Sequence, residues 1–278
     1  MSRSTVRERR DLCPGVLRPW PAEDGALVRV RLLGGRISGA QLRGLSELAG
    51  EHGDGDLHLT SRANLQVRGL PASGGALDAR VVDRIEELGL LPSRSHDLVR
   101  NVMVSPLTGL VAGMTAGRVD AWPVAVELER LLLADPRLAG LPGKFLFALD
   151  DGRGDLLDQR ADLTAVALDD SSVQVRVGGV WGESTSLANA ARLLVVLAQE
   201  FLRARGDGAD AAWHVAELGA PLMPAYEADP RVPVATGPLP YDERHVAVPD
   251  GVLTPEQAAE LGAHDLLVVT PWRGVVIR

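Results

Sequence analysis

The alternation of apolar and polar residues near the start of the chain predicts a strand, a helix and two further strands. Residues 26–33 alternate, which is typical of a half-buried strand. A stripe of leucines then recurs at helical spacing through 39–53, and Ser38 is in position to cap this helix. Alternation returns over 56–60 and over 64–70. Residues 19–75 are therefore interpreted as one β-α-β-β unit.

A shorter version of the same order returns over residues 241–278. Thr254 is the candidate N-cap of its helix, which is about two helical turns shorter than the first, so its apolar face keeps the same direction. The matching anchors are Gly35 with Gly251, Gln41 with Gln257, Asp56 with Asp265, and Thr60 with Thr270. The pattern thus predicts two half-units of one design.

The residues between the copies, 76–206, follow a different pattern and are interpreted as a central α+β domain. Helices are expected at 78–90, at 122–138 with Pro123 in the first turn, and at 186–206 with Ser186 as cap and Gly206 at the end. A strand or loop is expected at 101–110, and a meander of strands over 144–181. Residues 1–18 are interpreted as an irregular N-terminal extension, and the Pro- and Ala-rich residues 207–240 as a linker.

Composition excludes several classes of function. The chain has 278 residues, 46% of them hydrophobic, and a formal net charge of −8. This charge argues against a general nucleic-acid or anionic-membrane surface, although it leaves room for a local basic pocket. No segment has the form of a secretory signal or a membrane span, so a cytoplasmic protein is expected.

The metal-binding residue types are sparse. A single cysteine, Cys13, excludes an internal disulfide, a Cys-based zinc site and a four-cysteine iron–sulfur cluster held by this chain alone. It is interpreted as a buried turn residue. The six histidines lack ligand spacing, so no metal site is expected. The repeats GDGD and GRGD, at 53–56 and 152–155, are interpreted as turns.

The candidate chemistry is cationic. Arg62, Asn64, Gln66 and Arg68 follow one another at even spacing, so a strand would place those side chains on one face. Such a row is either a solvated face or a grip for an anionic ligand. Lys144 is the only lysine beside 28 arginines. A coding bias would explain the excess of arginine, and the surviving lysine is then either chance or a position that needs a compact, titratable ammonium.

Five motifs in order resemble the nitrite/sulfite reductase superfamily, and the closer likeness is to its precorrin-3B synthase branch. They are CPGVLRPW with DGALVRVRLLGGRIS, DGDLHLTSRANLQVRGL, RNVMVSPLTG, LPGKF and LLVVTPWRG. The resemblance implies an α+β fold in which two ferredoxin-like β-α-β-β half-units, related by pseudo-twofold symmetry, bracket a central tetrapyrrole-binding domain.

The resemblance also implies a site for an anionic, polycarboxylate tetrapyrrole, either siroheme as cofactor or a precorrin as substrate. The catalytic cations implied by the motifs are Arg29, Arg100 and Lys144. The residues implied to bind the macrocycle are Arg31, Arg62, Asn64, Gln66, Arg68 and Asn101. The opposing interpretation is that these arginines are ordinary strand charges, whose exposed pairs contribute about 0–1 kcal/mol each.

The implied function is that of an oxidoreductase of cobalamin biosynthesis. The family's [4Fe–4S] cluster has no ligands in this chain, so activity would need a cluster-bearing domain or a second polypeptide. Leu146 stands where the reductases often carry a second lysine, which argues against six-electron reduction of sulfite or nitrite. The alternatives are a non-catalytic tetrapyrrole carrier, a fragment of a siroheme-dependent nitrite or sulfite reductase, and a scaffold that binds nothing.

Overall fold

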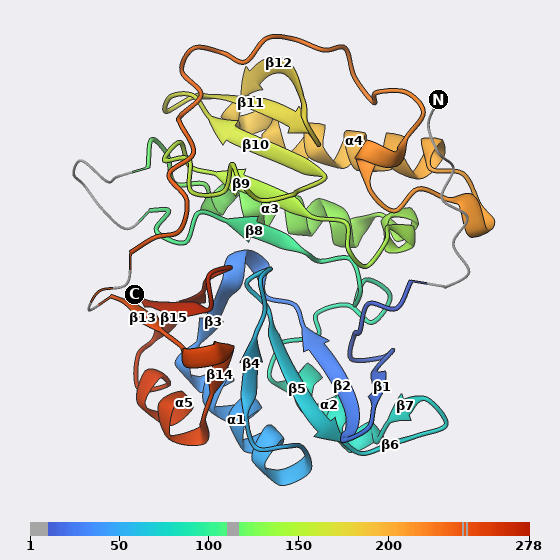
Figure 1. The fold of residues 1–278 in the computed structure, drawn as a ribbon, viewed down its shortest axis with the longest axis vertical. Helices are drawn as coiled ribbons and strands as arrows, with labels where there is room; N and C mark the ends of the chain where they lie inside the picture. The colour runs from blue at the N-terminus through green and yellow to red at the C-terminus, as the bar shows by residue number, and fades with distance from the viewer. Residues whose placement is uncertain (1–10, 110–116, 241, 243) are drawn as a thin grey trace. The chain divides into compact units, whose positions relative to one another are not determined.

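The computed structural model describes residues 11–109, 117–240, 242 and 244–278. The chain divides into two compact units (Figure 1). The first, here called the paired unit, is built from 13–100 and 238–278, and the second, the central unit, mainly from 101–237.

The paired unit contains two sheets of matching order. The first runs β1-β2-β5-β4-β14 and the second β13-β16-β15-β3. In each half-unit, the short strand before the helix belongs to the sheet of the other half-unit. Strand β3 pairs with β15, and β14 pairs with β4, both antiparallel. The strands of the first sheet are β1 (Trp20–Ala22), β2 (Gly25–Val30), β4 (Leu57–Leu59), β5 (Leu65–Leu70) and β14 (Val252–Leu253). Those of the second are β3 (Arg36–Ser38), β13 (His245–Ala247), β15 (Leu266–Val269) and β16 (Gly274–Ile277). This exchange confirms the predicted fold of two symmetry-related half-units.

Two helices of the paired unit, one in each half-unit, begin in the same way. In α1 (Gly39–His52), the Ser38 Oγ accepts from the Gln41 N–H at 3.1 Å while the Gln41 side chain accepts from the Ser38 N–H. In α5 (Pro255–Leu261), Thr254 and Gln257 make the same reciprocal pair. Such a capping box satisfies donors that a helix N-terminus would leave unpaired. The predicted caps are therefore confirmed.

The turn that follows the third strand of each half-unit is also repeated. The Thr60 N–H donates to the Asn64 carbonyl at 2.9 Å, and the Thr270 N–H donates to the Gly274 carbonyl at 2.9 Å. The residue before that carbonyl has a positive φ in both copies, +55° at Ala63 and +61° at Arg273. The predicted correspondence of Thr60 with Thr270 is confirmed by backbone geometry.

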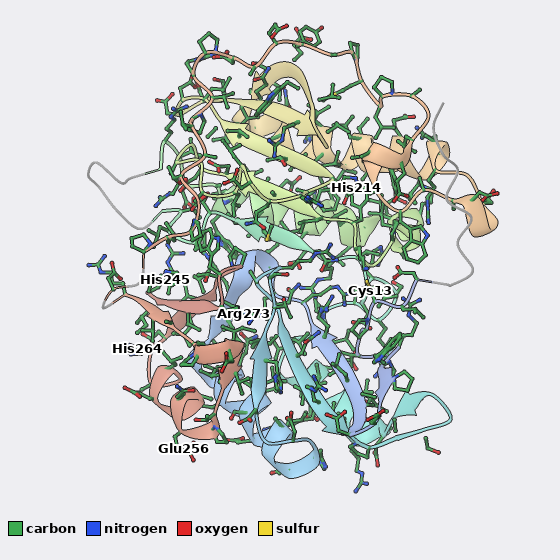
Figure 2. All side chains as sticks on the ribbon, in the orientation of Figure 1. Cys13, His214, His245, Glu256, His264 and Arg273 are labelled. Atoms are coloured by element: carbon green, nitrogen blue, oxygen red, sulfur yellow. The ribbon has the colours of Figure 1, made fainter. Side chains whose placement is uncertain are left out.

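One core joins both half-units and two segments that the sequence analysis assigns elsewhere. Helix α2 (Ala79–Glu87) packs on α1, and Ile85 is buried in the core that contains the leucines of α1. Val16 is buried in the same core, and Cys13 is also buried (Figure 2). Residues 76–100 thus fold with the first half-unit rather than with the central domain, because the apolar side of α2 is covered there. A minor hairpin, β6 (Ala72–Ser73) with β7 (Ala76–Leu77), precedes this helix.

The central unit has one sheet, in the order β12-β11-β10-β9-β8, with α3 and α4 against one face (Figure 1). The prediction of a meander over 144–181 is wrong at its first connection, because β9 and β10 are parallel. Residues 151–162 form the crossover of about a dozen residues that parallel strands require. The strands are β8 (Val102–Val104), β9 (Phe147–Asp150), β10 (Leu163–Ala167), β11 (Ser172–Val177) and β12 (Val180–Ser186).

The helices of the central unit differ from the prediction in two respects, the start of α4 and the end of α3. Helix α4 (Ala190–Ala204) begins after a 3-10 turn, and its N-cap residue Asn189 makes no side-chain capping bond, so Ser186 is not the cap. Gly206 follows the helix with a φ of +73°, as a terminating glycine should. Helix α3 (Trp122–Ala134) carries Pro123 in its first turn, as predicted, and ends before Pro136.

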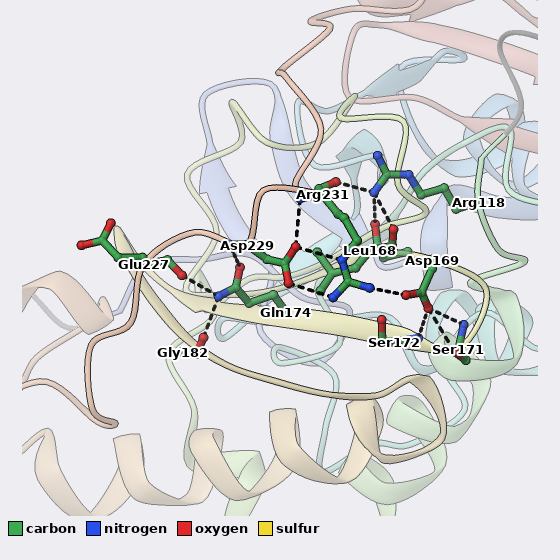
Figure 3. A network of polar contacts seen from close by, with 11 residues as sticks. Arg118, Leu168, Asp169, Ser171, Ser172, Gln174, Gly182, Glu227, Asp229 and Arg231 are labelled. Carbon is green, nitrogen blue, oxygen red and sulfur yellow. Dashed lines mark hydrogen bonds and ion pairs between the residues drawn. The ribbon is translucent and has the colours of Figure 1, made fainter.

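Part of the expected linker, residues 226–231, packs on the central sheet. Gln174 on β11 donates to the Glu227 carbonyl at 3.0 Å and accepts from the Asp229 N–H at 2.9 Å (Figure 3). Arg231 forms ion pairs with Asp229 and Asp169 in the same network. Pairing of its backbone by a buried amide explains why a Pro-rich stretch is ordered here.

In the part of the chain that the structure describes, no helix is both long and apolar enough to cross a bilayer.

Candidate functional site

The first sheet of the paired unit has one face on the core and one open face that carries polar residues. In β2, β4 and β5, side chains that face α1 are buried, whereas those that alternate with them are half-buried. Arg29 lies opposite Gln66, and Gln66 lies opposite His58. Neighbouring strands are about 5 Å apart, so these three side chains form one row across the open face. The shared face predicted for Gln66 and Arg68 is therefore confirmed.

Two basic residues on this face already have an acidic partner. Arg68 pairs with Asp24 at 3.2 Å, and His58 pairs with Asp54 at 2.8 Å. The Arg68 side chain is 40% exposed, so this ion pair contributes little to stability. To bind an anionic ligand, Arg68 has to break its ion pair with Asp24.

The turn 60–64 brings Arg62 close to Arg29. The Thr60 Oγ1 accepts from the N–H groups of Arg62 and Asn64, at 3.3 and 3.1 Å. The Asn64 Oδ1 accepts from the Leu32 N–H at 2.9 Å, which fastens the turn to the end of β2. Asn64 is 1% exposed. Its side chain, predicted to bind the macrocycle, therefore positions the turn that carries Arg62.

Arg29, Arg31, Arg62 and Arg100 form an arginine cluster within the paired unit. Burial is the largest cause of the lowered pKa of Arg29; Cys13 opposes it, and the positive charge of Arg62 adds to it. Burial also lowers the pKa of Arg31, to about 10, against the attraction of Asp97 and with the repulsion of Arg29 and Arg100. The four guanidinium groups thus repel one another, and burial removes part of the hydration of Arg29 and Arg31.

Several donors of this cluster are unsatisfied. In the described residues, the Arg29 Nε and the Arg31 Nε and Nη2 are buried without a hydrogen-bond partner. A buried donor without a partner costs about 1–3 kcal/mol, so such groups are rare unless a ligand completes them. The cluster fits a group of anionic oxygens, because guanidinium donors bind carboxylates with charge-assisted hydrogen bonds.

Arg31 and Arg100 are also fastened to the backbone. The Arg31 Nη1 donates to the Pro14 carbonyl at 3.2 Å and to the Asp97 carbonyl at 2.9 Å. The Arg100 Nη1 donates to the Arg31 carbonyl at 3.3 Å. Both side chains are buried. These bonds tie the segment around Cys13 to β2, which the sequence alone did not predict.

The second sheet lacks the polar row. The positions equivalent to Arg29, Gln66 and His58 hold His245, Val276 and Val268, which pair in the same register. All three are buried, and the His245 Nε2 is 3.0 Å from the Thr270 Oγ1 (Figure 2). Among the described residues of the two half-units, those of the first therefore form the half-open basic face.

The two remaining predicted site residues belong to the central unit. Lys144 is exposed in a turn in which the Phe145 N–H donates to the Pro142 carbonyl at 2.8 Å. The buried Asn101 donates from Nδ2 to the Gly143 carbonyl at 2.9 Å and to the Phe145 carbonyl at 3.4 Å. Asn101 thus holds the turn on both sides of Lys144. The chain passes from the paired unit to the central unit between Arg100 and Asn101, so Lys144 belongs to a different compact unit from the arginine cluster.

Two features of the structure were not predicted from the sequence. Asp97, the acidic neighbour of Arg31, is distant in sequence, and no local pattern marks it. In the central unit, Asp150, Asp151 and Asp155 form an acidic cluster that could hold a metal ion. No metal site was expected because the cysteine and histidines lack ligand spacing. The sequence signal for this cluster is the set of carboxylates in LDDGRGD.

Comparison with known proteins finds one matching half domain and several relatives of low identity. Residues 20–74 match the nitrite/sulfite reductase ferredoxin-like half domain. The chain is 29% identical over 144 residues to a precorrin-3B synthase from Sinorhizobium sp. It is 28% identical over 151 residues to a ferredoxin–nitrite reductase from Leptolyngbya laminosa, and 31% over 133 residues to one from Synechococcus elongatus. The first two matches cover 52% of this chain and the third 46%, but only 29%, 28% and 25% of the respective relatives.

The fold comparison covers more of the chain. The structure of the Mycobacterium tuberculosis NirA protein superposes with a TM-score of 0.68 at 19% identity, over 91% of this chain and 53% of that one. At this identity the likeness concerns the fold. Residues 20–74 thus form a nitrite/sulfite reductase ferredoxin-like half domain, and the chain is similar in sequence to precorrin-3B synthase and to ferredoxin–nitrite reductases.

Proposed function

We propose that the chain binds a polycarboxylate tetrapyrrole through the arginine cluster and the open face of the first sheet. The observation that supports this most directly is the set of buried, unpaired guanidinium donors on Arg29 and Arg31. A macrocycle with several carboxylates would supply both the missing acceptors and the missing negative charge. In this proposal, Arg62 and Gln66 contact the ligand, while Asn64 and Arg100 hold the contacting residues in place.

The proposed reaction class is oxidation of a precorrin, as in the precorrin-3B synthase to which the chain is similar. In that reaction one atom of dioxygen enters the macrocycle as a hydroxyl, the other becomes water, and two electrons and two protons are consumed. An iron–sulfur cluster supplies the electrons when bound. With one cysteine, this chain would receive them from a cluster held by another domain or by a second polypeptide.

Reduction of nitrite or sulfite is the second candidate, since two of the matched relatives are ferredoxin–nitrite reductases. The position of Leu146 favours the precorrin reaction. Leu146 is buried in an apolar cluster with Met103 and Leu156, and its N–H donates to the Asp162 Oδ2 at 2.9 Å. That position supplies no second ammonium beside Lys144, so fewer proton donors are available for a multi-electron reduction.

Binding is tested first with the purified full chain. Siroheme and uroporphyrin are titrated separately and followed by their visible spectra, with a porphyrin that has fewer carboxylates for comparison. We expect a saturable spectral shift for the carboxylate-rich ligands and a loss of at least tenfold in affinity for Arg62→Ala. The matched control is Arg80→Ala, an exposed arginine of the same unit that pairs with Asp78 at 2.8 Å. No shift with any tetrapyrrole, or equal losses in both variants, refutes the proposed site.

Catalysis is tested separately from binding. The chain is mixed with a cluster-bearing partner, a reductant, dioxygen and a precorrin, and the product is analysed by mass spectrometry. Gain of one oxygen atom supports the enzyme, whereas tight binding without turnover supports the carrier. Lys144→Ala should lower turnover and leave the affinity unchanged if the ammonium delivers protons. An unchanged rate would remove Lys144 from the reaction.

A further inference from the structure

The acidic cluster lies at the carboxyl edge of the parallel strands in the central unit. Asp150 is the last residue of β9, and Asp151 and Asp155 follow it in the crossover to β10. Ser105 comes directly after β8, which is parallel to β9, so it reaches the same edge. The carboxyl edge of parallel strands is where open α/β sheets commonly bind ligands. All three carboxylates are buried, at 2%, 0% and 1% exposure in chain order.

Two of the carboxylates are well supported by the protein. The Asp150 Oδ1 accepts from the N–H groups of Gly152 and Gly154, both at 2.9 Å, and its Oδ2 accepts from the Leu156 N–H at 3.0 Å. These bonds shape the loop. Asp151 forms a bidentate pair with Arg153, at 2.9 Å to Nε and 2.8 Å to Nη2. Each carboxylate still has free lone pairs, because a carboxylate has about four acceptor sites.

Asp155 is the exception. Its Oδ1 accepts from the Ser105 Oγ at 2.7 Å, but its Oδ2 is buried without a partner among the described residues. The structure therefore contains an uncompensated acceptor inside a group of three acids. Leaving a buried carboxylate oxygen unpaired is costly, and the usual solutions are a metal ion or a proton.

The charge of the group is also unbalanced. Three carboxylates face one paired guanidinium, that of Arg153, which leaves a formal charge of −2 when all are ionised. Arg176 attracts Asp150, but its Nη2 donates to the Leu157 carbonyl at 2.9 Å. A divalent cation would neutralise the remainder without moving these arginines.

We propose that Asp150, Asp151 and Asp155 bind one hard divalent cation, and that Ca²⁺ fits best. One oxygen of each carboxylate lies within 4.8 Å of the others, so a single ion can reach all three. Oxygens on opposite sides of Ca²⁺ are about 4.6–5.2 Å apart, against about 4.1 Å for Mg²⁺. Water would complete the coordination. The ligands are oxygens only, which disfavours softer metals such as zinc.

The competing occupant is a proton. Burial raises the pKa of Asp155 to about 8, and the charge of Asp150 contributes to the same direction. A neutral Asp155 would relieve the repulsion without a metal, so the experiment has to distinguish the two. The cation site does not depend on the tetrapyrrole proposal, because none of its residues belongs to the arginine cluster.

The test uses the full chain after treatment with a chelator. Ca²⁺ and Mg²⁺ are titrated separately by calorimetry, and Tm is followed with and without each ion. We expect one Ca²⁺ per chain, at least tenfold weaker binding of Mg²⁺, and a Tm rise of about 5–10 °C at a Ca²⁺ concentration of about 100 Kd. Asp155→Asn keeps an acceptor for Ser105 and should weaken Ca²⁺ binding at least tenfold. Asp158→Asn, an exposed acid of the same loop, should bind as the wild type does.

Three results would overturn the proposal. The first is a wild-type chain that shows neither heat nor a change of Tm up to about 10 mM Ca²⁺ or Mg²⁺, beyond the weakest protein calcium sites. The second is equal loss in Asp155→Asn and Asp158→Asn. The third is a stabilised Asp155→Asn with a calcium-insensitive wild type, which identifies a protonated acid. If Asp155→Asn does not fold, the wild-type titration and its bound calcium content still decide.

Discussion

Replacing Arg29 by methionine should stabilise the ligand-free protein while weakening its binding of an anionic tetrapyrrole. Arg29 is half-buried on the open face, its Nε lacks a partner among the described residues, and the positive charge of Arg62 repels it. Methionine keeps the apolar stem of the side chain and removes both the charge and the unsatisfied donor.

The size of the effect follows from these contacts. A buried donor without a partner costs about 1–3 kcal/mol, and half-burial places Arg29 at the lower end of this range, at about 1 kcal/mol. For a chain of this size that corresponds to a Tm rise of about 2–4 °C. Loss of one charge-assisted contact to the ligand, about 1.5–3 kcal/mol, lowers the affinity roughly 10- to 150-fold.

Urea unfolding and a tetrapyrrole titration of the same preparations measure both effects. Salt offers a second test, because KCl screens repulsion and should raise the Tm of the wild type more than that of Arg29→Met. The matched control is Arg68→Met, whose guanidinium pairs with Asp24 on the same sheet, so its stability should change by less than about 0.5 kcal/mol. A destabilised Arg29→Met with unchanged affinity would refute the reasoning, since Arg29 would then be a structural residue.

Three further outcomes test the supporting structure. Asn64→Ala should lower the free energy of unfolding by about 1–3 kcal/mol in urea, because the buried Leu32 N–H loses its acceptor; an unchanged value would mean that water replaces the amide. Gly35→Ala should lower the free energy of unfolding by more than about 2 kcal/mol in the same assay. Gly35 has a φ of +74°, and a Cβ there would lie 2.1 Å from the Val269 carbonyl oxygen. A variant as stable as the wild type would show that the backbone shifts at no cost. Burial lowers the pKa of His245, so the folded protein favours the neutral imidazole. The stability linked to it is fully present above the unfolded pKa of about 6.5, and is lost as the pH falls toward the folded pKa. His245→Gln should therefore flatten the decline of Tm between about pH 6.5 and 5, and an identical decline would assign it to other groups.

Local chemistry explains why the doubled half-unit could be predicted. The capping boxes at Ser38 and Thr254 join residues three positions apart, and the alternation in β2 and β5 records which face meets the core. These signals operate within a few residues, so the order of amino acids displays them directly. The even spacing of Gln66 and Arg68 predicted a shared face for the same reason.

Contacts between distant segments carry the information that the pattern does not contain. Asn64 and Asn101 were predicted to bind the macrocycle. The Asn64 side chain accepts from the Leu32 N–H, and the Asn101 side chain holds the turn that bears Lys144. An amide has the same sequence signature whether it meets a ligand or a backbone group. The parallel pairing of β9 with β10 likewise depends on the path of the crossover, which short-range alternation does not record.

The charged sites show the same division most clearly. The motifs pointed to Arg29, Arg31 and Arg100. Their mutual repulsion, and the attraction of Arg31 and Arg100 to Asp97, arise because β2 and the segment before residue 101 pack together. The three acids of LDDGRGD are visible in the sequence as a polar turn, and become a candidate cation site because the parallel sheet buries them beside Ser105. Burial removes water from a charge, and a pattern of residue types does not reveal which charges the folded chain will cover.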